Sequence, residues 1–80
     1  MEDVLLKIQE AFHAVFEVDP RSVTIETVPD HIEKWDSMGH VALATCLEQV
    51  FGVRLDVDEV MEMENVREIV RIIQSKLHSA

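Results

Sequence analysis

The sequence is poor in cysteine, proline, glycine and aromatic residues. Its 80 residues include one cysteine, two prolines and two glycines, and aromatic residues make up 5%. The lone Cys46 excludes an internal disulfide. With 48% hydrophobic and 29% charged residues, the composition argues against disorder, and together with the scarcity of proline and glycine it favours an ordered, soluble, helix-rich domain.

Basic residues are scarce as well. Sixteen acidic against seven basic side chains give a formal net charge of −9, which repels phosphate backbones and anionic membrane surfaces. We therefore expect no nucleic-acid binding. Such a charge either keeps a small protein soluble or speeds its encounters with proteins that present basic patches.

Long apolar runs are also missing. No stretch approaches the roughly 20 residues that a membrane-spanning helix needs. No charged leader followed by an apolar stretch marks a secretory signal. We therefore expect a cytoplasmic protein without a membrane span.

Helical periodicity is the main feature that the sequence does have, in a chain short enough for a single domain over residues 1–80. Apolar residues spaced three and four apart predict an amphipathic helix over residues 3–17. Asp3 is the expected N-cap, and Asp19-Pro20 closes this segment because the residue before a proline disfavours helical geometry.

The segment between residues 18 and 36 has no helical period. Its apolar residues recur irregularly around Pro29, and they are Val23, Ile25, Val28, Ile32 and Trp35. Long loops in small domains are usually functional or tied down by their own side chains. We therefore expect an ordered loop that is pinned to the core.

Three further helices are predicted downstream of this loop. The first covers residues 37–51, with Asp36 as N-cap and Gly52 as the stop, because glycine accepts positive φ at no steric cost. A short helix is expected at about 57–62. Asn65 caps a final helix over 65–77, whose buried stripe is Val66, Ile69, Val70, Ile73 and Leu77. The expected fold is all-α, an up-and-down four-helix bundle with three long helices, one short helix and a long first loop.

The segment Trp35-Asp36-Ser37-Met38 carries the chemistry. It places the Ser37 hydroxyl in the first turn of a helix, where unpaired backbone N–H groups and the positive end of the helix dipole gather. An anion bonded to Ser37 would be stabilised there, as phosphates are at helix N-termini. Serine beside an N-cap is common, however, so this pattern on its own favours a purely structural role.

In its wider context the sequence resembles the acyl carrier protein family. Asp36-Ser37-Met38 matches the family's Asp-Ser-Leu motif, and Leu47-Glu48 through Phe51-Gly52 matches its leucine-glutamate run ending in Phe-Gly. The resemblance covers nearly the whole chain, including the helix lengths, the long first loop and the acidic balance.

The resemblance implies a four-helix bundle of acyl-carrier type that works as a monomeric carrier, without catalysis of its own. A phosphopantetheinyl transferase would move a 4'-phosphopantetheine arm from coenzyme A to Ser37, and acyl-loading and acyl-processing enzymes would be the other partners. Acyl intermediates would be held as thioesters on the thiol of this arm, with apolar chains partly sheltered between the second and third helices. Asp36 would help the transferase to position metal and serine, and Met38 would lie under the arm.

Departures from the family pattern indicate unusual partners. Gly39, His40 and Ala42 stand where fatty-acid carriers usually have acidic residues, and Glu48 alone keeps the expected charge on that helix. Residues 48–68 hold seven acidic and two basic side chains, a net −5. We therefore predict a specialised lipid or secondary-metabolite pathway whose dedicated enzymes make contact by apolar fit and through the third helix. The predicted partner-binding residues are Glu48, Glu59, Val41 and Trp35.

Three further side chains near Ser37 or on the same helix can be interpreted from their positions. Trp35 either staples the entry to the second helix by packing toward Val41 or lies exposed as a recognition side chain. We interpret His40 as a surface histidine rather than a catalytic base, because two residues at a helix start do not make a reaction pocket. Cys46 is expected to be a buried, inert thiol.

Other functions compete with that of an acyl carrier. The histidines and the cysteine share no metal-ligand spacing, and Asp56-Val57-Asp58 lacks the later ligands of a calcium loop, so we expect no metal site. A peptidyl or aminoacyl carrier would keep the arm and change the cargo. An acidic helical adaptor would bind partner proteins without any arm. The sequence leaves cargo and pathway open.

Overall fold

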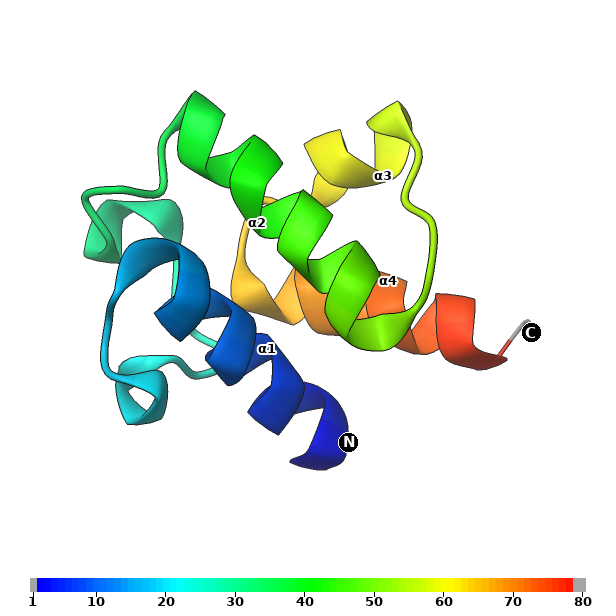
Figure 1. The fold of residues 1–80 in the computed structure, drawn as a ribbon, viewed down its shortest axis with the longest axis horizontal. Coiled ribbons are helices and arrows are strands. Elements are labelled where there is room, and N and C mark those ends of the chain that lie inside the picture. The colour runs from blue at the N-terminus through cyan, green and yellow to red at the C-terminus, as the bar shows by residue number, and fades with distance from the viewer. Residues whose placement is uncertain (1, 79–80) are drawn as a thin grey trace.

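The computed structural model describes residues 2–78. Within that range it contains four α-helices, which are α1 (Glu2–Phe16), α2 (Ser37–Phe51), α3 (Val57–Glu62) and α4 (Val66–His78). Two single-turn 3-10 helices, η1 (Pro20–Ser22) and η2 (Pro29–His31), lie between α1 and α2, and the described residues form no β-strand. In Figure 1, α3 lies on the side of α2 that faces away from α1. The predicted all-α architecture of three long helices and one short helix is confirmed.

One hydrophobic core joins all the long helices and the first loop. Its largest fully buried side chains include Ile8 and Phe12 of α1, Leu43 and Leu47 of α2, and Ile69 of α4. Aromatic rings fill the end of the core that lies beneath the start of α2. The ring of Phe12 meets that of Trp35 edge to face, with 5.1 Å between ring centroids, a geometry that aromatic pairs prefer.

α1 differs from its prediction at its start. The helix already includes Glu2, so Asp3 lies in its first turn and is not its N-cap. At the other end, Glu17 adopts a left-handed conformation with φ 60°, and its N–H donates to the carbonyl of His13 at 2.9 Å. This is a common way to end a helix. Asp19-Pro20 lies further along and starts η1, where Asp19 Oδ1 accepts from the N–H of Arg21 at 2.9 Å.

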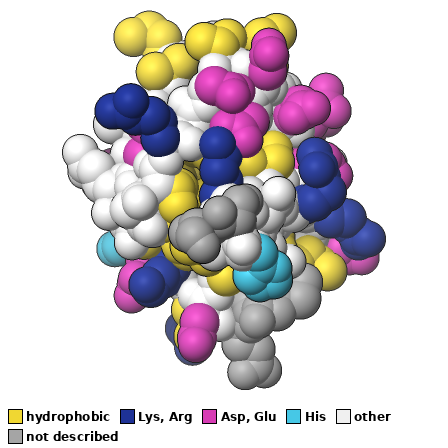
Figure 2. Space-filling view, turned by 90° about the vertical axis from the view of Figure 1, so that its right-hand side faces the viewer, with side chains coloured by type: hydrophobic (Ala, Val, Ile, Leu, Met, Phe, Trp, Pro, Cys, Tyr) yellow, Lys and Arg dark blue, Asp and Glu magenta, His cyan; other side chains and the backbone are white. Residues whose placement is uncertain are grey.

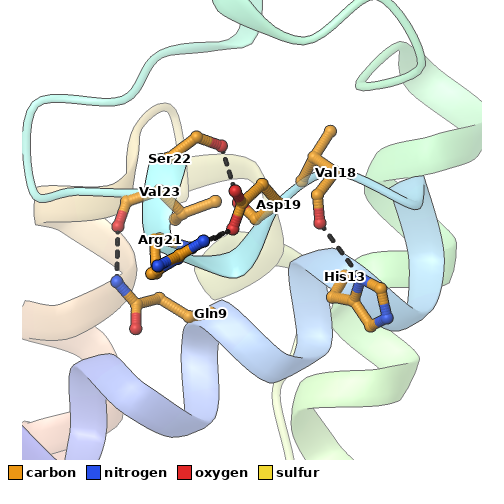
Figure 3. Close-up of polar contacts among 7 residues, drawn as sticks. All are labelled: Gln9, His13, Val18, Asp19, Arg21, Ser22 and Val23. Atoms are coloured by element: carbon orange, nitrogen blue, oxygen red, sulfur yellow. Dashed lines mark hydrogen bonds and ion pairs between the residues drawn. The ribbon is translucent and has the colours of Figure 1, made fainter.

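The long loop is ordered and held to the core, as predicted. Figure 3 shows Gln9 of α1 donating to the carbonyl of Val23, over a distance of 2.7 Å. Val23 itself is fully buried. Thr27 is also buried, its hydroxyl accepts from the N–H of Thr24 at 2.8 Å, and its carbonyl accepts from the N–H of Val66 at 3.1 Å. The loop is therefore attached to both α1 and α4.

α4 is capped as predicted, but its buried stripe is shifted. Asn65 Oδ1 accepts from the N–H of Glu68 at 2.9 Å, the hydrogen bond of an N-cap. Leu77 is 39% exposed and Ile72 is buried, so including Leu77 in the stripe was wrong. The last turn of α4 lies at one end of the molecule (Figure 1), where fewer elements remain to cover it. No helix among residues 2–78 is both long and apolar enough to cross a membrane.

Candidate functional site

The start of α2 presents the Ser37 hydroxyl to solvent. Asp36 is the N-cap, as predicted, because its Oδ1 accepts from the N–H of Gly39 at 2.8 Å. Ser37 is the first residue of the helix and is exposed. Within residues 2–78, no group forms a hydrogen bond with its hydroxyl. The N–H groups of Ser37 and Met38 come before the first intrahelical bond, which His40 makes to Asp36, so they are open to an anion.

Gly39 allows the first turn of α2 to lie directly against the loop and α1. A Cβ atom at this position would overlap the carbonyl oxygen of Lys34 and would lie 2.8 Å from the Phe16 ring. Only glycine leaves space for this approach. In the sequence, Gly39 stands out only as a position without an acidic side chain, because the loop residue that it meets cannot be deduced from spacing along the helix.

Trp35 forms the floor beneath this turn. It is 5% exposed, which rules out the alternative of an exposed recognition side chain and leaves a role at the entry to α2. Its ring lies against Phe12 and at 6.3 Å from Phe16, and its plane is within 17° of the imidazole plane of His40, with 6.1 Å between the two ring centroids. Val41 is 62% exposed. Trp35 therefore secures the entry to α2 through α1 and His40.

His40 is a half-buried bridge between α2 and α3, and its interpretation as a surface histidine was wrong. The indole N–H of Trp35 donates to His40 Nδ1 at 2.8 Å, and His40 Nε2 lies 2.7 Å from the carbonyl oxygen of Val60. An indole can only donate and a carbonyl can only accept. A neutral imidazole with its proton on Nε2 satisfies both neighbours.

A pocket with a volume of about 860 Å³ lies between α2 and α3. Asp36 and Ser37 line it at the start of α2, and Glu48 lines it about three turns further along. Much of its wall is apolar, formed by Val41, Ala44, Leu55, Val60, Met61 and Met63. The Ser37 hydroxyl is thus next to an apolar recess, which suits a group that is covalently attached there and carries an apolar end.

Large apolar side chains are exposed around this pocket. We call Met38, Val41, Val57 and Met61 the apolar rim; they are 84%, 62%, 73% and 71% exposed. Val41, Val57 and Met61 line the pocket, and Met38 follows Ser37 in α2. Figure 2 shows hydrophobic side chains gathered at the top of the molecule, with acidic side chains just beneath them. Exposed apolar groups that cluster in this way are typical of binding surfaces.

The two acidic residues predicted to bind partners make bonds within the molecule. Glu48 Oε2 accepts from the N–H of Leu55 at 2.8 Å. Glu59 Oε1 lies 2.7 Å from Lys76 Nζ and accepts from the N–H of Asp56 at 3.0 Å. These hydrogen bonds, first from Lys76 and then from Asp56, lower the pKa of Glu59 below its ordinary value. Contact of Glu48 and Glu59 with partners stays a prediction.

Cys46 and the possibility of a metal site remain to be described. Cys46 is half-buried against the core, so it is less enclosed than predicted. Among residues 2–78, no group of three or more histidine, cysteine, aspartate or glutamate side chains is placed to hold a metal ion.

A family model and two known proteins each match most of the chain. The family model described as "Phosphopantetheine attachment site" matches residues 6–73. The acyl carrier protein of Treponema denticola is 29% identical over 76 residues, which cover 95% of this chain and 97% of that protein. The acyl carrier protein of Coprothermobacter proteolyticus is 26% identical over 78 residues, which cover 98% of this chain and 95% of that protein.

Proposed function

Because the chain belongs to the acyl carrier protein family, whose prosthetic group is 4'-phosphopantetheine, we propose that Ser37 is the residue that bears this arm. The observation that carries the proposal is the free, exposed hydroxyl of Ser37 at the N-terminus of a 15-residue helix. The match to the family model includes this residue.

The residues around Ser37 fit a phosphate group. The positive end of the α2 dipole and the open N–H groups of its first turn would stabilise the negative charge of a phosphodiester on Ser37. Asp36 uses Oδ1 to cap the helix, and its second oxygen is left for the metal ion of the transferase. When attached, the arm supplies the thiol that holds an acyl group as a thioester.

Intact mass spectrometry separates this proposal from an acidic adaptor without an arm. The protein is incubated with coenzyme A and a promiscuous phosphopantetheinyl transferase, beside the variants Ser37→Ala and Ser22→Ala. Ser22 is also exposed but lies in η1, so its variant is a matched control. We expect one added arm in the wild type and in Ser22→Ala and none in Ser37→Ala. An unmodified wild type, under conditions that modify a known carrier, would favour the adaptor.

We further propose that the pocket between α2 and α3 shelters apolar acyl groups. Its apolar wall begins beside Ser37, and burying apolar surface stabilises a chain by about 25 cal/mol per Å². The names of the relatives support acyl cargo over aminoacyl cargo. Loading by an adenylating, amino-acid-activating enzyme, with no loading by acyl-transferring enzymes, would favour the peptidyl or aminoacyl alternative.

Dedicated enzymes of a specialised lipid or secondary-metabolite pathway are the proposed partners. The start of α2 supports this, because Gly39, His40 and Ala42 give it no acidic side chain where fatty-acid carriers usually have one. Acidic side chains, which lie just beneath the hydrophobic ones at the top of Figure 2, would steer basic enzyme surfaces toward this side of the molecule. A ketosynthase of fatty-acid synthesis should use this carrier less efficiently than an ordinary fatty-acid carrier. Equal efficiency would overturn the proposal.

A further inference from the structure

α3 is held in place mainly from its ends. None of its own residues, Val57–Glu62, is buried. The buried anchors on either side are Leu55, which is 9% exposed, and Met63, which is fully buried. A short helix without a buried face has little packing energy of its own. Besides the anchors Leu55 and Met63 and the half-buried Val60, which packs against the core, polar bonds that reach α3 therefore help to fix its position over the pocket.

Polar bonds from α2 and α4 reach this segment. Glu48 binds the N–H of Leu55 ahead of α3, and Lys76 of α4 pairs with Glu59 in the middle of α3. His40 binds the carbonyl of Val60 toward the end of α3. Of these three side chains, only His40 belongs to the first turns of α2, close to Ser37.

The His40 bond has a rigid base. On its other side the imidazole accepts from Trp35, whose ring is fixed by its packing against Phe12 and Phe16. The indole and imidazole planes are also nearly parallel, at 17° to each other. A side chain fixed on one side by a buried ring transmits that fixed position to whatever it binds on the other side.

We propose that His40 is a positioning residue, which holds the C-terminal end of α3 over the Ser37 end of the pocket through the relay Trp35–His40–Val60. The relay sets the width of the pocket where a group attached to Ser37 would enter it. This consequence for cargo rests on the proposed function, whereas the positioning of α3 does not.

Two substitutions distinguish bridging from simple packing. In His40→Gln, the side-chain amide oxygen can accept from the Trp35 indole while the amide nitrogen donates to Val60. His40→Phe keeps a ring of similar size but leaves the indole N–H and the carbonyl unpaired. A packing role would tolerate phenylalanine better than glutamine, and a bridging role predicts the reverse order. His31→Phe, at an exposed histidine in η2, is the matched control.

Amide hydrogen exchange on the unmodified protein is the test. We expect His40→Phe to exchange the α3 amides, including those of Val60 and Met61, about tenfold faster than the wild type, in line with the loss of one well-made hydrogen bond. Exchange in α1 should change much less. His40→Gln and His31→Phe should stay close to the wild type. An unchanged α3 in His40→Phe, or equal acceleration in α1 and α3, would overturn the proposal.

A second measurement uses the wild type alone, so it does not depend on whether a variant folds. Nitrogen-15 chemical shifts of His40 in the wild type should show an unprotonated Nδ1 and a protonated Nε2, and the single indole N–H of Trp35 should be protected from exchange. The opposite tautomer, or an unprotected indole, would contradict the relay. Because both measurements use protein without an arm, their failure is distinguishable from failure of Ser37 to be modified.

Discussion

Lys76 Nζ lies 2.7 Å from Glu59 Oε1, so the last turns of α4 are joined to α3 by an ion pair. The two side chains are 29% and 25% exposed, which is more enclosed than the other ion pairs among residues 2–78, each of which has at least one partner more than half exposed. The hydrogen bonds that Glu59 accepts from Lys76 and from the N–H of Asp56 lower its pKa. This pair therefore links stability to pH.

The first prediction concerns the free energy of unfolding at acid pH. Because the folded protein lowers the pKa of Glu59, the stabilisation is fully present above the carboxyl's ordinary pKa and is lost as the pH falls through the lowered value. At neutral pH, Glu59→Gln should reduce the free energy of unfolding by about 0.2–1 kcal/mol, the range measured for ion pairs that solvent reaches. Urea unfolding over a pH series measures the gap between wild type and variant.

That gap should close at the acid end of the series. Glu10→Gln is the control, since Glu10 is exposed on α1, and its effect should vary less with pH. A Glu59→Gln gap that stays constant through the acid range would contradict the linkage.

The second prediction compares the two glycines. Gly39→Ala places a methyl group against the Lys34 carbonyl and should cost about 1–3 kcal/mol, as overpacking does. Gly52→Ala meets open space but keeps φ at 64°, so its cost of about 1 kcal/mol comes from backbone strain alone. Denaturant unfolding gives both values. A Gly39→Ala variant as stable as the wild type would show that α2 does not lie as close to the loop as described.

The third prediction concerns shelter of the cargo. If the pocket covers an apolar chain that begins at Ser37, an octanoyl thioester on the carrier should react with hydroxylamine severalfold more slowly than an acetyl thioester. The same two groups on free pantetheine supply the control for intrinsic reactivity. Equal rates on the carrier, after that correction, would argue against the pocket as an acyl site.

Much of the fold could be predicted because its signals are local. Asp36, Gly52 and Asn65 act within four residues of their own positions, so their capping roles follow from the sequence. The bounds of α2 and α3 agree with the prediction, while α1 and α4 are each displaced by one residue. Exposure of Leu77 was missed because periodicity does not show where neighbouring elements end.

The parts of the site that could not be predicted depend on contacts between distant segments. Val60 is twenty residues beyond His40, and nothing in a helical pattern places its carbonyl beside that imidazole. The bond of Glu48 could not be predicted for the same reason, because it reaches seven residues on to Leu55. The first turn of α2 could be identified as the candidate site from the sequence, whereas the relay Trp35–His40–Val60 could be found only in the structure.

The attachment of the arm is tested most directly by locating it in the chain. After modification by the transferase, tandem mass spectrometry of the peptide that contains Ser37 should find the phosphopantetheine group on that hydroxyl, and the peptides that contain Ser22, Ser75 and Ser79 should be unmodified. A group on any of those other serines, or on none, would contradict the assignment of Ser37.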